Sequence, residues 1–113
     1  MKIDPAQRQE ARQIAAELAK LARTAQVLPG SIQERLMRCG RTGCACHSHP
    51  PRLHGPYWQW TRKVAGKTVT RYISSQTASD YQSWLENDRR IRELVGRLEA
   101  LGIAHLEAQQ HHD

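Results

Sequence analysis

The chain has 113 residues, the length of one domain with room for one modest hydrophobic core. Hydrophobic residues make up 39% and phenylalanine is absent, so we expect something besides apolar burial to help hold the fold. The formal net charge of +6 favours an anionic partner such as a nucleic acid. No stretch approaches membrane-spanning length and the N-terminal residues lack the apolar core of a signal peptide, so we expect a cytoplasmic protein with no membrane partner.

The first predicted element is an amphipathic helix within residues 1–27. Asp4 and Pro5 are a typical start: a capping side chain, then a residue whose missing N–H is not needed at the first helical position. Apolar residues then recur at helical spacing, at Ala11, Ile14, Ala15, Leu18, Leu21, Ala22 and Ala25. We expect the helix to end near Ala25, before the breaker sequence Leu28-Pro29-Gly30.

Residues 31–38 are too few for apolar spacing to distinguish a helical turn from a strand. We favour a strand, because the hairpin predicted further along needs a third partner to be stable. Residues 39–56 contain three glycines and three prolines, so we expect an irregular loop there.

A β-hairpin is predicted at residues 57–64 and 67–73, because both stretches are rich in aromatic and β-branched residues and an Ala-Gly pair separates them. The sequence leaves two registers of this hairpin open. A two-residue turn places Trp58 opposite Ile73, whereas a three-residue loop places it opposite Tyr72. A slip of one residue changes which side chains share a face. We expect the hairpin tryptophans to belong to the core.

A long helix is predicted at residues 77–110, beginning near Ala78 and carrying a broad apolar stripe. We expect Gly102 to mark a break before a last turn. This helix and the N-terminal one are predicted to pack as an antiparallel pair or, alternatively, with a second copy of the chain as a homodimer.

Three cysteines, Cys39, Cys44 and Cys46, lie within eight residues. An odd number packed so closely does not form a disulfide framework, and thiolate and imidazole are the ligands that a tetrahedral structural zinc ion prefers. The candidates for the fourth ligand are His47, His49 and His54. We favour His54, because it precedes the hairpin and would attach the loop to the sheet. The predicted cofactor is therefore Zn²⁺.

These elements predict an α+β fold: an N-terminal helix, a small antiparallel sheet of two or three strands with a zinc-binding loop, and a long C-terminal helix. The chain is predicted to be one domain over residues 1–113, divided into 1–27, 28–76 and 77–110. No enzyme activity is expected, because the cluster has no carboxylate to act as a general base and the sequence has no phosphate-binding glycine loop.

The hairpin supplies the predicted nucleic-acid contacts, which are Gln59, Arg62, Lys63, Lys67 and Arg71. Basic groups can neutralise phosphates, and Gln or Arg can read base edges from a two-stranded ribbon in the major groove. Exposed aromatic residues on the same hairpin would instead stack single-stranded bases. The alternative interpretation is that the basic residues are ordinary solvated charges at a hairpin tip.

Several motifs resemble those of a small uncharacterised bacterial domain family with the signature L-P-G-S, C-G-K-x-G-C-x-C and H-G-P-Y. The matching segments are Leu28-Pro29-Gly30-Ser31, Cys39-Gly40-Arg41-x-Gly43-Cys44-x-Cys46 and His54-Gly55-Pro56-Tyr57, followed by a basic hairpin and a helix. The resemblance covers about residues 28–98. It implies a bacterial protein with His54 as the histidine of the pattern, and it implies no activity. Arg41 stands where the signature has lysine.

The basic sheet followed by a helix is also similar in architecture to the arm-type DNA-binding domains of phage integrases, an analogy that does not fix function. The sequence thus predicts a zinc-stabilised nucleic-acid-binding protein, with duplex DNA favoured over RNA and a regulatory or mobile-element accessory role. The alternative prediction is a dimeric protein-interaction adaptor whose zinc loop is purely structural.

Overall fold

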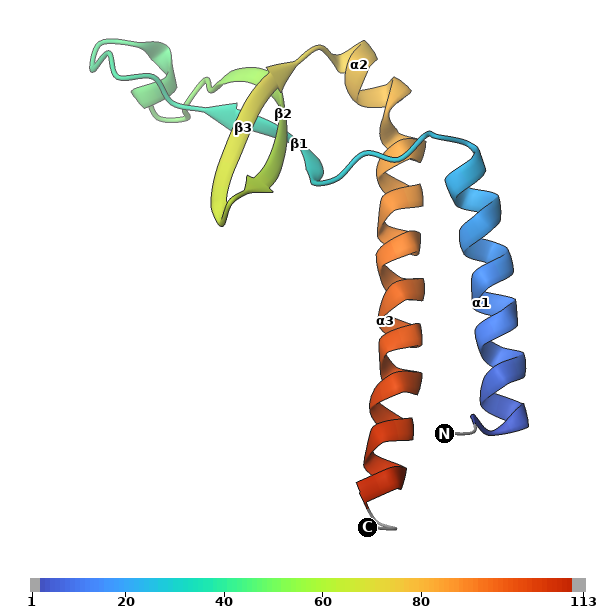
Figure 1. The fold of residues 1–113 in the computed structure, drawn as a ribbon. Coiled ribbons are helices and arrows are strands. Elements are labelled where there is room, and N and C mark those ends of the chain that lie inside the picture. Colours follow the sequence, from blue (N-terminus) through green and yellow to red (C-terminus); the bar gives the residue numbers. More distant parts are fainter. Residues whose placement is uncertain (1–2, 111–113) are drawn as a thin grey trace. The chain divides into compact units, whose positions relative to one another are not determined.

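The computed structural model describes residues 3–110 of the chain (Figure 1). Its elements are, in order, α1 (Pro5–Arg23), β1 (Ser31–Met37), the 3₁₀ turn η1 (Ala45–His47), β2 (His54–Val64), β3 (Lys67–Ile73), α2 (Ser75–Asp80) and α3 (Gln82–Gln110). The predicted α+β class is confirmed: an N-terminal helix, a three-stranded antiparallel sheet and a long C-terminal helix.

The chain forms two compact units. The helical unit comprises the described residues of Met1–Leu28 and Glu86–Asp113, and the sheet unit is Pro29–Leu85. The predicted extent of one domain over residues 1–113 stays a prediction.

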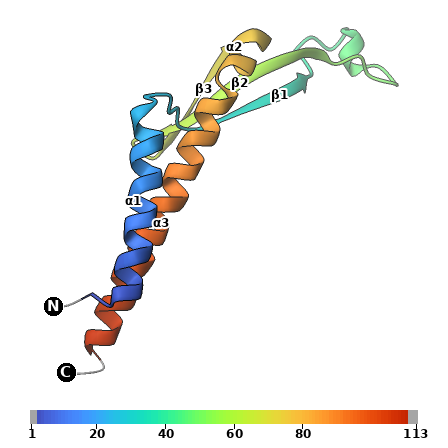
Figure 2. The same cartoon turned by 90° about the vertical axis from the view of Figure 1, so that its right-hand side faces the viewer.

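In the helical unit, α1 and α3 lie side by side and run in opposite directions (Figures 1 and 2). Their apolar stripes supply two fully buried side chains, Ile14 from α1 and Leu94 from α3. Glu17 accepts hydrogen bonds from Nε of Arg90 and, at 2.9 Å, from its Nη2. Burial of the stripes and this two-point contact fix how the helices face each other.

The ends of α1 differ from the prediction in detail. Pro5 does occupy the start of the helix, but the side chain of Asp4 makes no capping hydrogen bond, so the predicted cap is wrong. The carbonyl of Asp4 instead accepts from the backbone N–H of Arg8 at 2.9 Å. The helix ends at Arg23, two residues earlier than expected, and Ala25 has a φ of 54° that is incompatible with a continuing helix.

The C-terminal helical region begins earlier than predicted and is divided. Ser74 caps α2 by accepting from the backbone N–H of Thr77 at 3.0 Å, so this helix begins at Ser75. Tyr81, with φ −99° and ψ 4°, separates α2 from α3. The break expected at Gly102 is absent, because α3 continues through it to Gln110.

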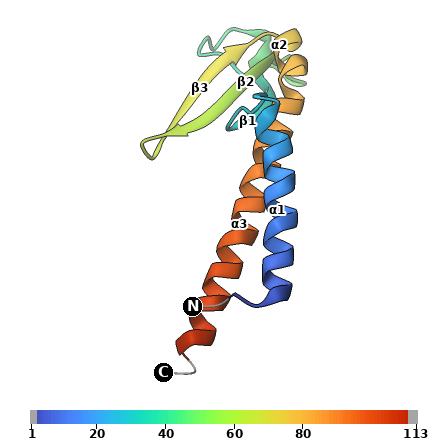
Figure 3. The ribbon, with the colours of Figure 1, turned by 45° about the vertical axis from the view of Figure 1, so that its right-hand side comes forward.

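The sheet has the order β1-β2-β3, with β2 in the centre, and the predicted third strand is present as β1 (Figure 3). Trp58 is opposite Ile73, the register expected for a two-residue turn. Ala65 and Gly66 both have positive φ, 51° and 79°, as a type I′ turn requires. The prediction of an irregular loop over residues 39–56 is wrong at η1 and at residues 54–56, which begin β2.

The register also assigns side chains to faces, since neighbours along a strand point to opposite sides of a sheet. The tryptophan face comprises Ile32, Glu34, Trp58, Trp60, Arg62, Val64, Lys67, Val69, Arg71 and Ile73. The tyrosine face comprises Ser31, Gln33, Arg35, Tyr57, Gln59, Thr61, Lys63, Thr68, Thr70 and Tyr72. Trp58 and Trp60 are half-buried, and Nε1 of Trp60 donates to the carbonyl of Pro29 at 2.8 Å.

Candidate metal centre

Four side chains from the loop between β1 and β2 converge on one point. Cys39, Cys44, Cys46 and His54 bring their ligand atoms within 4.8 Å of one another. The Sγ atoms of Cys39 and Cys46 are 3.6 Å apart, and Sγ of Cys44 is 3.2 Å from Nε2 of His54. A tetrahedral zinc ion with Zn–S bonds of about 2.3 Å separates two sulfurs by roughly 3.8 Å. The four groups are therefore close enough to hold a metal ion.

Secondary structure on both sides of the loop positions these ligands. Cys39 follows β1 by two residues, and His54 is the first residue of β2, where it pairs with Met37. Between them, Cys44 precedes the η1 turn and Cys46 lies within it. The ends of the loop are thus fixed by the sheet, and the 3₁₀ turn presents two sulfurs only two residues apart.

The cluster shifts the pKa of two of its thiols in opposite directions. The pKa of Cys44 is lowered to about 6, chiefly by a hydrogen bond from the backbone amide of Cys46 and then by the side chains of Cys46, Cys39 and His54. Burial raises the pKa of Cys46, which is fully buried. Since the thiolate is the form that binds a metal, the surroundings of Cys44 favour a ligand already at neutral pH.

The structure brings together the three cysteines and His54, the set chosen from the sequence. The other two candidate histidines lie outside the cluster. Nε2 of His47 is 2.7 Å from the carbonyl oxygen of Cys39 and its side chain is exposed. His49 is also exposed.

The five predicted nucleic-acid contacts do not share one face of the sheet. Lys67 and Arg71 are exposed on the tryptophan face, where the half-buried guanidinium of Arg62 lies 4.7 Å from the ring centroid of Trp60. On the tyrosine face, Nζ of Lys63 donates to Oγ1 of Thr68 at 2.8 Å. Gln59 is only 8% exposed, which does not favour its predicted contact with a base.

Sequence reasoning missed how unevenly the charge is distributed. Residues 35–79 contain eight of the 17 Lys and Arg residues and none of the 11 Asp and Glu residues. The sheet unit carries the whole formal charge of +6, and the helical unit has a formal charge of zero. A count of charges along the chain would have found this signal.

The ion pairs are also distributed unevenly between the two units. Within residues 3–110, the four ion pairs all lie in the helical unit, and they are Arg90–Glu17, Arg90–Glu93, Arg92–Asp88 and Arg97–Glu10. No cation of the sheet unit has an acidic partner in this part of the chain. Its positive charge is therefore left for solvent, counterions or an external anion.

These features define a class: a small α+β domain with a potential metal centre of three cysteines and one histidine, set in a strongly basic sheet unit. The chain belongs to a family described as a domain of unknown function, DUF6788, which matches residues 6–83. The match includes α1, which precedes the motifs that carry the resemblance, and ends just inside α3. No curated protein and no solved structure gives a match. None of the described helices is long and apolar enough to cross a membrane.

Proposed function

We propose that this protein is a zinc-stabilised nucleic-acid-binding domain that binds duplex DNA in the bacterial cytoplasm, in a regulatory or mobile-element accessory role. The observation that carries the proposal is the acid-free stretch of residues 35–79, with its formal charge of +8. Cations without acidic partners attract a polyanion and release its condensed counterions on binding. No catalytic role is part of the proposal.

Zinc suits the donor set of the cluster. Three thiolates and a neutral imidazole are common ligands of a closed, structural site, and the four donors leave no position open for a substrate. Such a centre has a formal charge of −1, so it would leave the surrounding stretch strongly positive. Cys46 is the one fully buried residue of the loop at residues 38–53. Apolar burial therefore contributes little to the order of this loop, and metal binding would supply it.

The two faces of the hairpin suit insertion into a groove. The major groove admits a two-stranded ribbon, and phosphates line both of its walls. Lys67 and Arg71 point to one side of the ribbon and Lys63 points to the other. A ribbon inserted edge-on would thus present cations to both walls. The division of the predicted contacts between two faces is compatible with this arrangement.

The test is fluorescence anisotropy of the zinc-loaded protein with labelled duplex DNA, single-stranded DNA and RNA across a salt series. We expect duplex binding that weakens steeply with salt, since each neutralised phosphate adds about −0.9 to the slope of log K against log salt concentration. The double variant Lys67→Gln/Arg71→Gln should reduce the magnitude of that slope by about 2.

The matched control is Lys20→Gln/Arg89→Gln, which removes the same charge from exposed positions of the helical unit. It should leave the slope unchanged. An absence of binding to every nucleic acid at low salt would contradict the proposal.

A second candidate function is a dimeric protein-interaction adaptor in which the zinc loop is purely structural. The observation in its favour is a mainly apolar hollow of about 430 Å³ in the helical unit, lined by Ile3, Ala11, Leu98 and Leu101 among others. Ile103 and Leu106 are also 58% and 59% exposed. Light scattering after size-exclusion chromatography tests this candidate. A dimer that persists at high salt, without affinity for nucleic acid, would favour it.

A further inference from the structure

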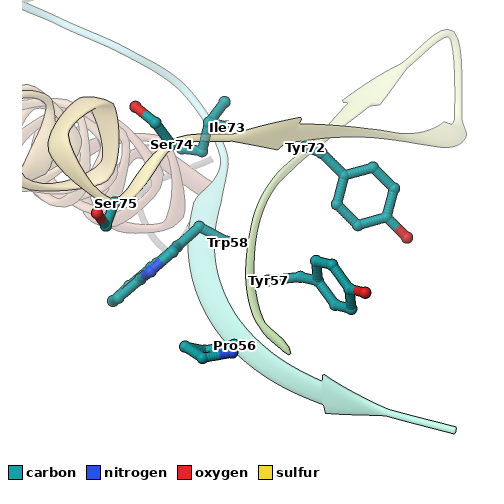
Figure 4. A pocket seen from close by; sticks show the side chains of 7 residues that line it. All are labelled: Pro56, Tyr57, Trp58, Tyr72, Ile73, Ser74 and Ser75. Atoms are coloured by element: carbon teal, nitrogen blue, oxygen red, sulfur yellow. The ribbon is translucent and has the colours of Figure 1, made fainter. Parts of the chain in front are cut away.

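Two adjoining hollows of the sheet unit share a pair of exposed tyrosines. The larger hollow, about 460 Å³, is lined by Pro56, Tyr57, Trp58 and Tyr72, with Ser74 and Ser75 also contributing (Figure 4). The smaller hollow, about 320 Å³, is lined by the same tyrosines together with Arg38, His54 and others. The larger hollow is thus rich in aromatic rings, and the smaller one is lined in part by a cationic side chain.

The larger hollow arises where strand pairing ends. β3 stops at Ile73, opposite Trp58, and the chain then turns into α2. β2 begins four residues earlier, at His54, and there it pairs only with β1 on its other side. Residues 54–57 therefore have a free edge toward the side where β3 has ended, and the hollow lies along that edge.

The tyrosines that separate the hollows are not core residues. Tyr57 is 40% exposed and Tyr72 is 63% exposed. Their ring centroids are 5.9 Å apart with an angle of 69° between the planes, an edge-to-face contact that leaves ring surface free. Figure 4 shows both rings on one side of the sheet and Trp58 on the other. Exposed rings in a basic surface are what proteins use to stack nucleobases.

We infer that the two hollows together bind one unpaired nucleotide. Its base would stack on the tyrosine pair in the larger hollow, and its phosphate would face Arg38 in the smaller one. The faces of a paired base are covered by its neighbours in the stack, so the occupant must be unpaired. The charge of the site favours a nucleotide over an aromatic peptide side chain, since Arg38 lines the smaller hollow in the acid-free stretch and can pair with a phosphate, which such a side chain lacks.

This inference rests on the proposed function, because the rest of the nucleic acid is held by the basic hairpin. It predicts a preference that phosphate contacts alone do not give. A duplex with one unpaired, bulged base should bind more tightly than the fully paired duplex of the same length. Stacking of one base on an aromatic side chain corresponds to a preference of about 5- to 150-fold.

The experiment compares these two duplexes by anisotropy at one salt concentration, using the zinc-loaded full chain. Tyr72→Ala should abolish the preference for the bulged duplex, and Tyr72→Phe should keep it. Arg38→Gln should weaken binding of the bulged duplex more than that of the paired one. The matched control is Thr70→Ala, an exposed position on the same strand and face, which should keep the preference. Zinc content and thermal unfolding check that each variant is folded.

A second readout places 2-aminopurine at the bulge, where stacking on the tyrosines should quench its fluorescence in the wild type and not in Tyr72→Ala. Equal affinity for both duplexes would overturn the inference and leave the proposed function standing. Equal weakening of both complexes by Tyr72→Ala would also overturn the inference and leave the proposed function standing. If the wild type binds neither duplex, that result would instead contradict the proposed function.

Discussion

Cys44 and His54 meet through their side chains, with Sγ 3.2 Å from Nε2, although they are ten residues apart in the chain. This contact attaches the loop that contains η1 to the first residue of β2. Because His54 also pairs with Met37, its backbone is held by the sheet independently of the cluster. A ligand on a strand lowers the entropy lost when the site closes on an ion.

Replacement of this histidine tests the metal centre. His54→Ala should weaken Zn²⁺ binding by more than about tenfold, because three thiolates then share the ion with water. Competition with a chromogenic chelator measures the affinity. His49→Ala is the matched control, since His49 lies outside the cluster, and it should bind zinc like the wild type. Zinc affinity equal to that of the wild type in His54→Ala would mean that the fourth ligand is not His54.

Metal removal should affect the two units differently. With the ion chelated, we expect amide protons of residues 38–53 to exchange faster, because Cys46 is the one fully buried residue of that loop. The helices of the helical unit hold no cluster residue and should keep their exchange rates and their circular dichroism. Hydrogen exchange with mass spectrometry measures the exchange of the loop and of the helices separately. Unchanged exchange in the loop would show that the metal does not order it.

Stability should depend on pH through the pair formed by Glu17 and Arg90. The hydrogen bond from Arg90 lowers the pKa of Glu17 below its usual 4.5. The lowered pKa stabilises the folded state above pH 4.5, and this contribution is lost as the pH falls through the folded-state pKa. Glu17→Gln should therefore unfold at a lower denaturant concentration than the wild type at pH 7, with a smaller difference at pH 3. The matched control is Glu99→Gln, which removes the same charge from an exposed position of the helical unit.

Gly30 is a position where the backbone and the packing both require glycine. Its φ is 94°, and a Cβ built there would lie 2.2 Å from the carbonyl oxygen of Thr61. Gly30→Ala should destabilise the protein by more than about 1 kcal/mol, because the strained conformation and the clash with backbone add together. Gly43→Ala, where a Cβ meets nothing within 4 Å, should have a small effect. Chemical denaturation of both variants measures the difference.

Local signals in the sequence predicted the elements well but left two registers of the hairpin open. The structure decides between them, because Ala65 and Gly66 both adopt the positive φ of a two-residue type I′ turn. The cluster was also predictable, since its donors are close in sequence. The break between α2 and α3 at Tyr81 was not predictable, because neither a proline nor a glycine marks it. The burial of Gln59 depends on packing that the hairpin pattern does not contain, as its amide donates to Met37 Sδ on β1 at 3.9 Å.

The helical unit is assembled from two stretches of chain between which the whole sheet unit is inserted. Nδ2 of Asn87 donates to the carbonyl of Gln26 at 2.9 Å, so the chain leaves and re-enters this unit at adjacent points. Pairing of Glu17 with Arg90 must bring together residues 73 apart, which costs loop-closure entropy while the intervening chain is unfolded. A sheet unit that folds first shortens that loop. We therefore expect zinc to speed the refolding of two helices that contain none of its ligands.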